Sequence, residues 1–278
     1  MPGAHATITF LSDYGLADPF VGVCHAVMAR IAPHARVVDL THGVARHDVT
    51  GGATALADCA PYLPRGVHLA VVDPGVGTDR RAVALTAGGH VLVGPDNGLL
   101  LPAAERLGGV DGVDGAWELV TPAYRLEPLS ATFHGRDVFA PAAAHLARGV
   151  PPAELGPGRD PVGLVRLDLP GATQGDGRLQ ATVVGVDGFG NVALSALGED
   201  LAEVGMEAGD TVAVEVGAGS TTATVATAFA EVPDDVLVLL VDSTGRAALA
   251  VNGGDAASLL GAHPGAAVAV TRTPRATR

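Results

Sequence analysis

Lysine is absent from the sequence, so all 17 basic side chains are arginines. This absence excludes Schiff-base chemistry on a lysine amine, the lysine of phosphate-binding loops and lysine general bases. Cysteine is scarce as well, because only Cys24 and Cys59 occur, far apart in apolar helical patterns without metal-ligand spacing. We therefore expect two reduced core thiols, and a cysteine nucleophile is not favoured.

The sequence also contains few basic residues and no long apolar run. The 17 basic residues stand against 30 acidic ones, and the formal net charge is −13. A chain this acidic lacks the basic surface that binding to nucleic acid or anionic membranes requires, so neither partner is expected. No apolar run is long enough to span a bilayer, and the N-terminus has no basic segment followed by an apolar one. These features predict a cytoplasmic protein.

The first half of the sequence alternates between strand-like and helix-like segments. Apolar runs typical of buried strands occur at 7–11, 36–40 and 67–73. Helical apolar stripes lie between them, and this alternation predicts a parallel sheet with right-handed crossovers. Beyond the third strand we expect a hairpin with strands at 82–86 and 90–94. Two further helices are expected at 99–107 and 137–148.

The composition changes near residue 151. Proline and glycine pairs crowd residues 151–177, which indicates a linker. Seven strand-like runs separated by Gly, Asp and Pro follow, with one short helix expected near 255–260. We therefore predict a mostly parallel α/β sheet domain over 1–155, a linker over 156–176 and an all-β, barrel-like domain over 177–278.

Two acidic residues end strands of the predicted parallel sheet. Asp13 follows the first strand and Asp73 the third, and carboxyl ends of parallel strands meet at the edge where α/β sheets bind ligands. Asp13 could hold a ribose diol or only cap an Asx-turn. Asp73 could serve chemistry or form a surface ion pair with Arg80 or Arg81. Asp18, which precedes a proline, is explained as a helix N-cap.

Other polar candidates lie outside that sheet edge. His134 stands just before an expected helix and can titrate near neutral pH or hold a polar ligand. In the second domain, Asp187, Phe189 and Asn191 fall within five residues. Phe189 could stack on a base whose edge Asn191 reads, although a glycine-rich turn explains the same residues. Ser243 lies in a similar polar turn.

Two kinds of site find no support in the sequence. Gly75 and Gly77 do not form a dinucleotide fingerprint, because the third glycine and the following helix are missing. The histidines and acids show no short metal-ligand spacing, so no metal site is expected.

Six motifs follow one another along nearly the whole chain, at residues 10–15, 72–78, 94–98, 132–137, 187–191 and 252–254. Together they resemble the adenosine-forming S-adenosylmethionine hydrolases, which share a fold with the S-adenosylmethionine-dependent fluorinase and chlorinase. The resemblance implies that water replaces methionine at C5′ of the ribose, giving adenosine and L-methionine. S-adenosylmethionine is then the substrate, and no cofactor is expected. The resemblance also implies a homotrimer, with the ligand between the N-terminal domain of one subunit and the C-terminal domain of the next.

The same resemblance assigns roles to residues. The Asp-Arg-His trio of the family falls on Asp73, Arg80 and His134, and Arg80 is preferred to Arg81 because the family arginine lies seven residues after the aspartate. Arg80 and His134 are expected to bind the water, while Asp73 orients them or takes the proton. The implied substrate contacts fall on Asp13 for the ribose, Phe189 and Asn191 for adenine, Asp187 and Ser243 for methionine, and also on Asp18, Val251 and Gly253.

Three alternatives remain beside this hydrolase hypothesis. The halogenases of the family look aromatic at the position of Asp73 and carry Tyr at that of His134, so a halogenase is less favoured. A metal-dependent nucleotide phosphohydrolase would use Asp13 and Asp18 as ligands, but a tight acidic cluster is missing. A non-catalytic adenosine-binding protein would not obviously require the trio. The motifs do not select between the sulfonium epimers, although some family members are thought to prefer the (R)-epimer.

Overall fold

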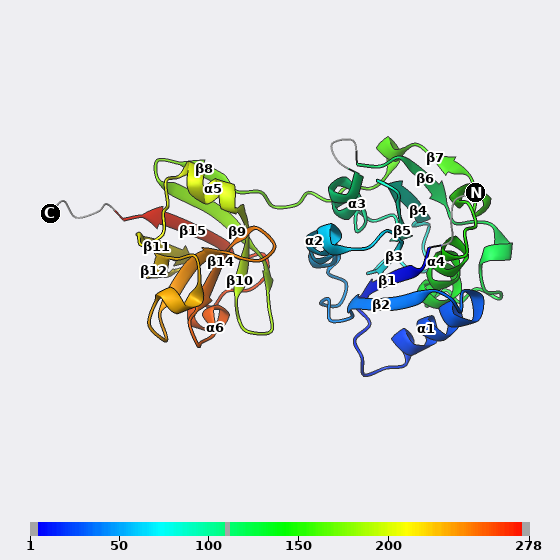
Figure 1. Cartoon of the computed structure of the whole chain (residues 1–278), viewed down its shortest axis with the longest axis horizontal. Coiled ribbons are helices and arrows are strands. Elements are labelled where there is room, and N and C mark those ends of the chain that lie inside the picture. The colour runs from blue at the N-terminus through cyan, green and yellow to red at the C-terminus, as the bar shows by residue number, and fades with distance from the viewer. Residues whose placement is uncertain (1–4, 109–111, 274–278) are drawn as a thin grey trace. The chain divides into compact units, whose positions relative to one another are not determined.

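The computed structural model describes residues 5–108 and 112–273, and the chain divides into two compact units, Met1–Asp168 and Leu169–Arg278 (Figure 1). Each unit has hydrophobic clusters of its own, built almost entirely from aliphatic side chains. The segment predicted as a linker holds two short strands, β7 (Gly158–Arg159) in the first unit and β8 (Thr173–Gly175) in the second.

A seven-stranded sheet forms the centre of the first unit. In chain order its strands are β1 (Thr7–Ser12), β2 (Arg36–Thr41), β3 (Val67–Val71), β4 (Ala82–Ala87), β5 (His90–Pro95), β6 (Gly115–Glu118) and β7. Their spatial order is β2-β1-β3-β5-β4-β6-β7. The pairs among β2, β1, β3 and β5 are parallel, as the strand–helix alternation predicts. The remaining strands continue the sheet in antiparallel fashion, beginning with the expected β4–β5 hairpin.

Helices pack on both faces of this sheet (Figure 1). Over the described residues the α-helices of this unit are α1 (Phe20–Ile31), α2 (Val49–Cys59), α3 (Leu101–Gly108) and α4 (Ala140–Ala147). Alternate strand residues divide between the faces, so Phe10 packs with α1 and α4 while Leu11 packs with α2 and α3. Cys24 of α1 is buried and free, and burial raises the pKa of its thiol to about 12. A thiol so rarely ionised fits the expected core role.

The second unit is a closed β-barrel. Its strands after β8 are β9 (Arg178–Val186), β10 (Val192–Leu197), β11 (Thr211–Val216), β12 (Gly219–Val225), β13 (Leu237–Val241), β14 (Arg246–Val251) and β15 (Ala267–Arg272). Neighbours follow the order β10-β14-β13-β12-β11-β15-β9-β8, and an additional β9–β10 pairing closes a ring of seven strands. The predicted α/β sheet followed by a barrel-like domain is thus confirmed.

The prediction of a single short helix in the second unit was wrong. Besides α6 (Ala256–Leu260), a six-residue helix α5 (Gly198–Glu203) follows β10. Its first turn is held by Asp200, whose Oδ2 accepts a hydrogen bond of 2.6 Å from the amide of Leu197, and Leu201 is buried in the barrel core. A helix this short depends on capping and packing, and its sequence is too short to show a helical period.

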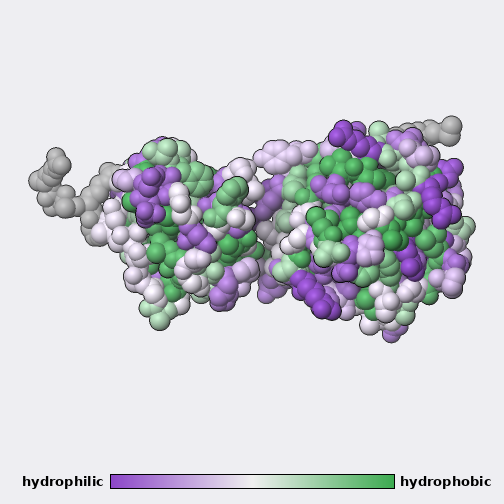
Figure 2. Space-filling view, turned by 90° about the horizontal axis from the view of Figure 1, so that it is seen from below, coloured by the Kyte–Doolittle hydropathy of each residue, from purple (hydrophilic) through white to green (hydrophobic). Residues whose placement is uncertain are grey.

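Hydrophobic and hydrophilic residues are interspersed over the face of both units that Figure 2 shows. Among the described residues, the structure contains no helix that is both long enough and apolar enough to cross a membrane.

Candidate active site

Asp73 and Arg80 form a two-pronged ion pair beside the end of β3. Arg80 Nε donates to Asp73 Oδ1 over 3.0 Å, and Arg80 Nη2 donates to Oδ2 over 2.5 Å. Both side chains are more than nine-tenths buried. A paired guanidinium and carboxylate in this geometry make strong, directional hydrogen bonds. The expected preference for Arg80 over Arg81 fits this geometry, since Arg81 pairs instead with Asp96.

The loop between these two residues requires glycine at one position. Gly77 has a φ of +78°, and a Cβ there would lie 2.3 Å from the carbonyl oxygen of Ala131. Any side chain would therefore push the loop away from the segment that leads to His134.

His134 joins the pair from a segment 54 residues further along the chain. Its Nδ1 lies 3.2 Å from Arg80 Nη2. A guanidinium only donates, so Nδ1 accepts and the ring proton of the neutral imidazole sits on Nε2. Burial lowers the pKa of His134, and the Arg80 cation lowers it further, while Asp73 acts in the opposite direction. The imidazole is therefore neutral at physiological pH.

The backbone that follows His134 differs from the expected helix. A π-helical turn, Gly135–Phe139, precedes α4 where a regular helix from residue 137 was expected. A Cβ on Gly135 would lie 2.0 Å from the hydroxyl oxygen of Tyr14, so only glycine allows this close approach. π-turns often occur at functional sites, where the extra residue redirects a side chain.

A cavity of about 500 Å³ opens over Asp73 and His134. One part of its lining is aromatic, and the rings of Tyr14, Phe20 and Phe133 pack edge to face or tilted against one another. The polar lining comes from two sources. The loops after β1, β2 and β3 contribute Asp13, Asp18, Arg46, His47 and Asp73, and the segment before the π-helical turn contributes Thr132 and His134. Arg80 is not part of the lining and stacks instead over the ring of Phe139 at 5.2 Å. A volume of this size suits a nucleoside-sized ligand.

Asp13 and Asp18 both reach this cavity, but in different ways from those expected. Asp13 Oδ2 accepts a hydrogen bond of 2.9 Å from the amide of His47. This bond connects the loop after β1 with the loop after β2, whereas one of the two predicted alternatives was a local Asx-turn. The interpretation of Asp18 as an N-cap was wrong, because Pro19 holds the N-cap position of α1 and no side-chain cap bond is made there. The carboxylate of Asp18 lies in the cavity lining instead.

Most second-unit candidates gather at one end of the barrel. Asp187 accepts three hydrogen bonds of 2.8–2.9 Å, from the amides of Phe189 and Asn191 and from Asn191 Nδ2. This turn contacts the segment after Val251, since Gly190 accepts from the amide of Ala257. Phe189 is 82% exposed, whereas Val251 is buried. Asp187 thus shapes the turn that presents the ring of Phe189.

Ser243 is separated from this group. It lies in the β13–β14 turn, which Asp242 stabilises by accepting hydrogen bonds from Thr244 and Arg246. Val251 ends β14 and Gly253 follows it, so Ser243 and the pair Val251 and Gly253 lie at opposite ends of a six-residue strand. The strand spans about 20 Å at its usual rise per residue.

Several lining residues were missed from the sequence. Tyr14 and Phe133 are immediate neighbours of predicted residues and stand within the recognised motifs, so a signal was present. Arg46 and His47 belong to the loop after β2 and showed no motif. His47 adopts a φ of +65°, which is rare for a non-glycine residue and orients its amide toward Asp13.

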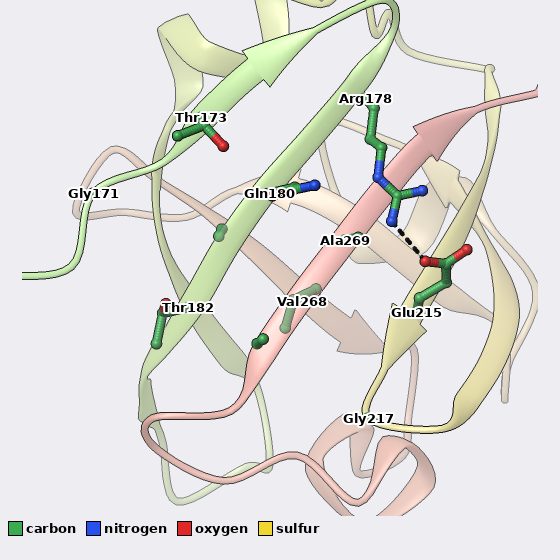
Figure 3. Close-up of a pocket in the computed structure, with 11 residues that line it drawn as sticks. Gly171, Thr173, Arg178, Gln180, Thr182, Glu215, Gly217, Val268 and Ala269 are labelled. Atoms are coloured by element: carbon green, nitrogen blue, oxygen red, sulfur yellow. Dashed lines mark hydrogen bonds and ion pairs between the residues drawn. The ribbon is translucent and has the colours of Figure 1, made fainter.

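A second concavity of about 500 Å³ lies on the outer wall of the barrel (Figure 3). Arg178 crosses it, donating to Glu215 Oε2 over 2.8 Å and to Thr271 Oγ1 over 3.1 Å. The described residues that line it include none of the predicted site residues. The Arg178 cation of this lining is already paired with the Glu215 carboxylate, and Asp73, Arg80 and His134 are not among its lining residues.

The chain matches known proteins over nearly its full length. The model of the SAM hydroxide adenosyltransferase N-terminal domain matches residues 8–156, and that of the C-terminal domain matches residues 181–269. A protein of Salinispora arenicola named (R)-S-adenosyl-L-methionine hydrolase is 52% identical, over 95% of this chain and 97% of its own. A protein of Actinoplanes sp. named fluorinase is 30% identical over 72% of this chain and 74% of its own.

A solved structure agrees with these matches. The crystal structure of an uncharacterized conserved protein from Thermotoga maritima superposes with a TM-score of 0.90 at 35% identity, and covers 95% of this chain and all of the other. Sequence and fold agree from the first strand to the last strand of the barrel. This chain belongs to the SAM hydroxide adenosyltransferase family.

Proposed function

We propose that this chain hydrolyses S-adenosylmethionine, and its (R)-sulfonium epimer in particular, to adenosine and L-methionine. The observation that supports this most strongly is the partly buried Asp73–Arg80–His134 network at a nucleoside-sized cavity. The choice of epimer rests on the name of the Salinispora relative.

In the proposed reaction, the oxygen of a water molecule bonds to C5′ of the ribose while the C5′–S bond breaks. The bonding electron pair stays on sulfur, so the sulfonium leaves as the neutral thioether of methionine and needs no general acid. The 5′-oxygen is briefly protonated and then gives up one proton. The products are adenosine, methionine and that proton, and no cofactor takes part.

Asp73 is the proposed proton acceptor. Both of its oxygens already accept from Arg80, but each carboxylate oxygen keeps another lone pair. A carboxylate paired with arginine is a weak base, yet the protonated 5′-hydroxyl is so acidic that a weak base suffices. In the neutral tautomer described above, His134 Nε2 carries a proton and cannot accept another, which favours Asp73.

We assign positioning roles to His134 and Arg80. His134 positions the attacking water, and Arg80 positions both His134 and the proton acceptor Asp73. His134 presents its Nε2–H as a donor to the water, which fixes the line of attack opposite sulfur. Arg80 is not part of the cavity lining, so we place it behind the other two as the group that holds them. This revises the expectation that Arg80 itself binds water.

Substrate binding is assigned to the remaining predicted residues. Asp13 and Asp18, in the cavity lining, are proposed to hold the ribose and to favour the sulfonium cation electrostatically. The exposed ring of Phe189 suits stacking on adenine, with Asn191 reading its edge. Asp187 and Ser243 for the methionine ends, and Val251 and Gly253 as further contacts, remain proposals from the family resemblance. So do the homotrimer and the cytoplasmic location.

The competing activities are less well supported. The fluorinase relative is more distant, and Asp73 and His134 differ from the aromatic and Tyr positions of the halogenases. A nucleotide phosphohydrolase would need Asp13 as a metal ligand, whereas Asp13 is engaged by the amide of His47.

The test is to incubate each epimer separately with the protein in water enriched in heavy oxygen and to follow adenosine by chromatography and mass spectrometry. We expect adenosine that carries the label at its 5′-hydroxyl, formed faster from the (R)-epimer. Asp73→Asn should abolish most turnover while leaving adenosine binding measurable, and Asp79→Asn, an exposed neighbour, serves as the control. Failure of both epimers to yield adenosine would refute the proposed function, and unlabelled adenosine would exclude water as the nucleophile.

A further inference from the structure

Three potential metal ligands meet outside the cavity, between α1 and the end of β2. His25 Nε2 lies 2.8 Å from Asp39 Oδ1, and His42 Nε2 lies 3.1 Å from the same oxygen. One ligand atom from each of the three residues falls within 4.8 Å of the others. The spacing of 14 and three residues matches no short metal motif, so the sequence did not reveal this cluster.

The ring of His42 is the second, independent observation. Its side chain is 3% exposed, and among the described residues its Nε2 finds no hydrogen-bond partner. The 3.1 Å approach to Asp39 lacks the geometry of a hydrogen bond. A buried imidazole nitrogen without a hydrogen bond is costly, and a cation held between this nitrogen and the Asp39 carboxylate would remove that cost.

The other nitrogen of His42 is already held. Its Nδ1 lies 2.7 Å from Ser12 Oγ, which also accepts from the amide of Tyr14 at 3.3 Å. When Nδ1 carries the proton and donates it to Ser12, Nε2 points its lone pair into the cluster. A metal-ligating imidazole usually donates its other ring N–H to a carboxylate, a backbone carbonyl or a water, and here the Ser12 hydroxyl stands in that position.

We propose that His25, Asp39 and His42 form a binding site for a divalent transition metal ion, with Zn²⁺ as the representative. Two imidazoles and one carboxylate match the ligand preferences of Zn²⁺, with water completing the coordination. Mg²⁺ and Ca²⁺ prefer oxygen ligands and fit less well. Ligand atoms about 2.0–2.1 Å from a tetrahedral ion stand roughly 3.3 Å apart. The two histidine–aspartate distances of 2.8 and 3.1 Å lie close to this separation.

The site is separate from the proposed chemistry but adjoins its framework. The three ligands are not part of the cavity lining. The carbonyl oxygen of His42 accepts a 2.8 Å hydrogen bond from the amide of Gly15, and its ring holds Ser12. A bound ion would therefore brace the loop that carries Asp13 and would raise the thermal stability of the first unit. This inference does not rest on the proposed function, and it revises the expectation of no metal site.

The experiment uses full-length, tag-free protein freed of metal by a chelator and then dialysed. Co²⁺ is titrated while its visible absorption is recorded, and Zn²⁺ is then added to displace it. We expect saturation at one equivalent per chain, reversal by Zn²⁺, and an upward shift of the unfolding midpoint with Zn²⁺. His25→Ala and Asp39→Asn change partly exposed residues and should each weaken binding at least tenfold.

His263→Gln is the matched control, because His263 is an exposed histidine of the second unit. The hydrogen bond described for its ring is to the carbonyl oxygen of the adjacent Pro264. It should bind Co²⁺ as the unmodified chain does. Circular dichroism without metal checks that all variants are folded. If the unmodified protein shows no saturable absorption, or if His25→Ala and Asp39→Asn bind as tightly as His263→Gln, the cluster is a hydrogen-bond network and the proposal is wrong.

Discussion

Arg80 Nη2 lies 3.2 Å from His134 Nδ1 and at the same time donates to Asp73. One guanidinium thus connects a carboxylate seven residues before it with an imidazole 54 residues after it. Because Arg80 can only donate, it sets the tautomer of His134 as well as its position.

The tautomer predicts how activity depends on pH. Burial first, and the Arg80 cation next, hold the pKa of His134 below its ordinary value of 6.5, so the ring gains a proton only in more acidic solution. Protonation removes the acceptor at Nδ1 and places two cations together. We expect kcat/KM to be flat near neutral pH and to fall as the pH decreases below 6.5.

Nitrogen-15 NMR of the histidine side chains checks the same point directly. The signal of His134, identified by its loss in His134→Gln, should show the proton on Nε2 at pH 7. A proton on Nδ1 would contradict the proposed role of Arg80, and an acidic limb centred above pH 6.5 would contradict the lowered pKa.

Arg80→Lys tests whether the fork of the guanidinium is needed. A lysine keeps the charge but cannot bond to both oxygens of Asp73 and to His134 at once. We expect kcat to fall by about 10²-fold, because a displacement of about 1 Å in the groups that Arg80 holds is enough for a loss of that size. The measurement is steady-state adenosine formation.

Arg81→Lys is the matched control for that experiment. Arg81 makes its own ion pair with Asp96 and donates to the carbonyl oxygen of Gly163, away from His134. Its replacement should leave kcat within a few-fold of the original while lowering stability slightly. Equal losses in the two variants would mean that the Arg80 network has no special role.

Mixing variants tests the proposed trimer with shared sites. Asp73→Asn and Phe189→Ala should each be nearly inactive or strongly weakened alone. In an equal mixture of the two variants, refolded together, half of the subunits keep Asp73 and the other half keep Phe189. If each site takes Asp73 from one subunit and Phe189 from the next in a ring, about a quarter of the sites would contain both residues. Activity restored to that level, measured at equal protein concentration, supports the shared site.

Size-exclusion chromatography with light scattering gives the mass of the same mixtures. Phe189 is 82% exposed, so its truncation should not disturb the barrel fold. A monomeric mass, or mixtures no more active than the average of their components, would argue against subunit sharing.

Gly77→Ala tests the loop between Asp73 and Arg80. Its φ of +78° strains any side chain, and the added methyl would also meet Ala131. We expect a loss of about 1–3 kcal/mol in unfolding free energy together with lost turnover. Chemical denaturation gives the first quantity and adenosine formation the second.

Gly265→Ala separates the two causes, since Gly265 has a φ of +87° with nothing within 4 Å of an added Cβ. It should cost about 1 kcal/mol through backbone strain alone and leave turnover unchanged. Identical costs at both positions would show that the contact with Ala131 is unimportant.

The order of elements could be predicted because it depends on local pattern. Apolar periodicity and Gly and Pro punctuation were sufficient for the parallel strands, the β4–β5 hairpin and the all-β second unit. The same reasoning placed Asp13 and Asp73 at one sheet edge, and the pairing of Ser12 with Val71 in parallel strands agrees with it. Helix α5 escaped prediction because its stability comes from the Asp200 cap and from burial of Leu201.

The sequence by itself therefore determined the strand ends that carry acids, the glycine loop after β3 and the membership of a family. Only the tertiary structure decided that Arg80 reaches His134, that Asp18 lies in a cavity lining rather than capping α1, and that His25 meets Asp39 and His42. The physical reason is that hydrogen bonds form over about 3 Å between atoms that packing brings together. The pattern of apolar residues along the sequence indicates which face of a helix or strand a residue occupies. The packing of the core determines which residues from other elements become its neighbours.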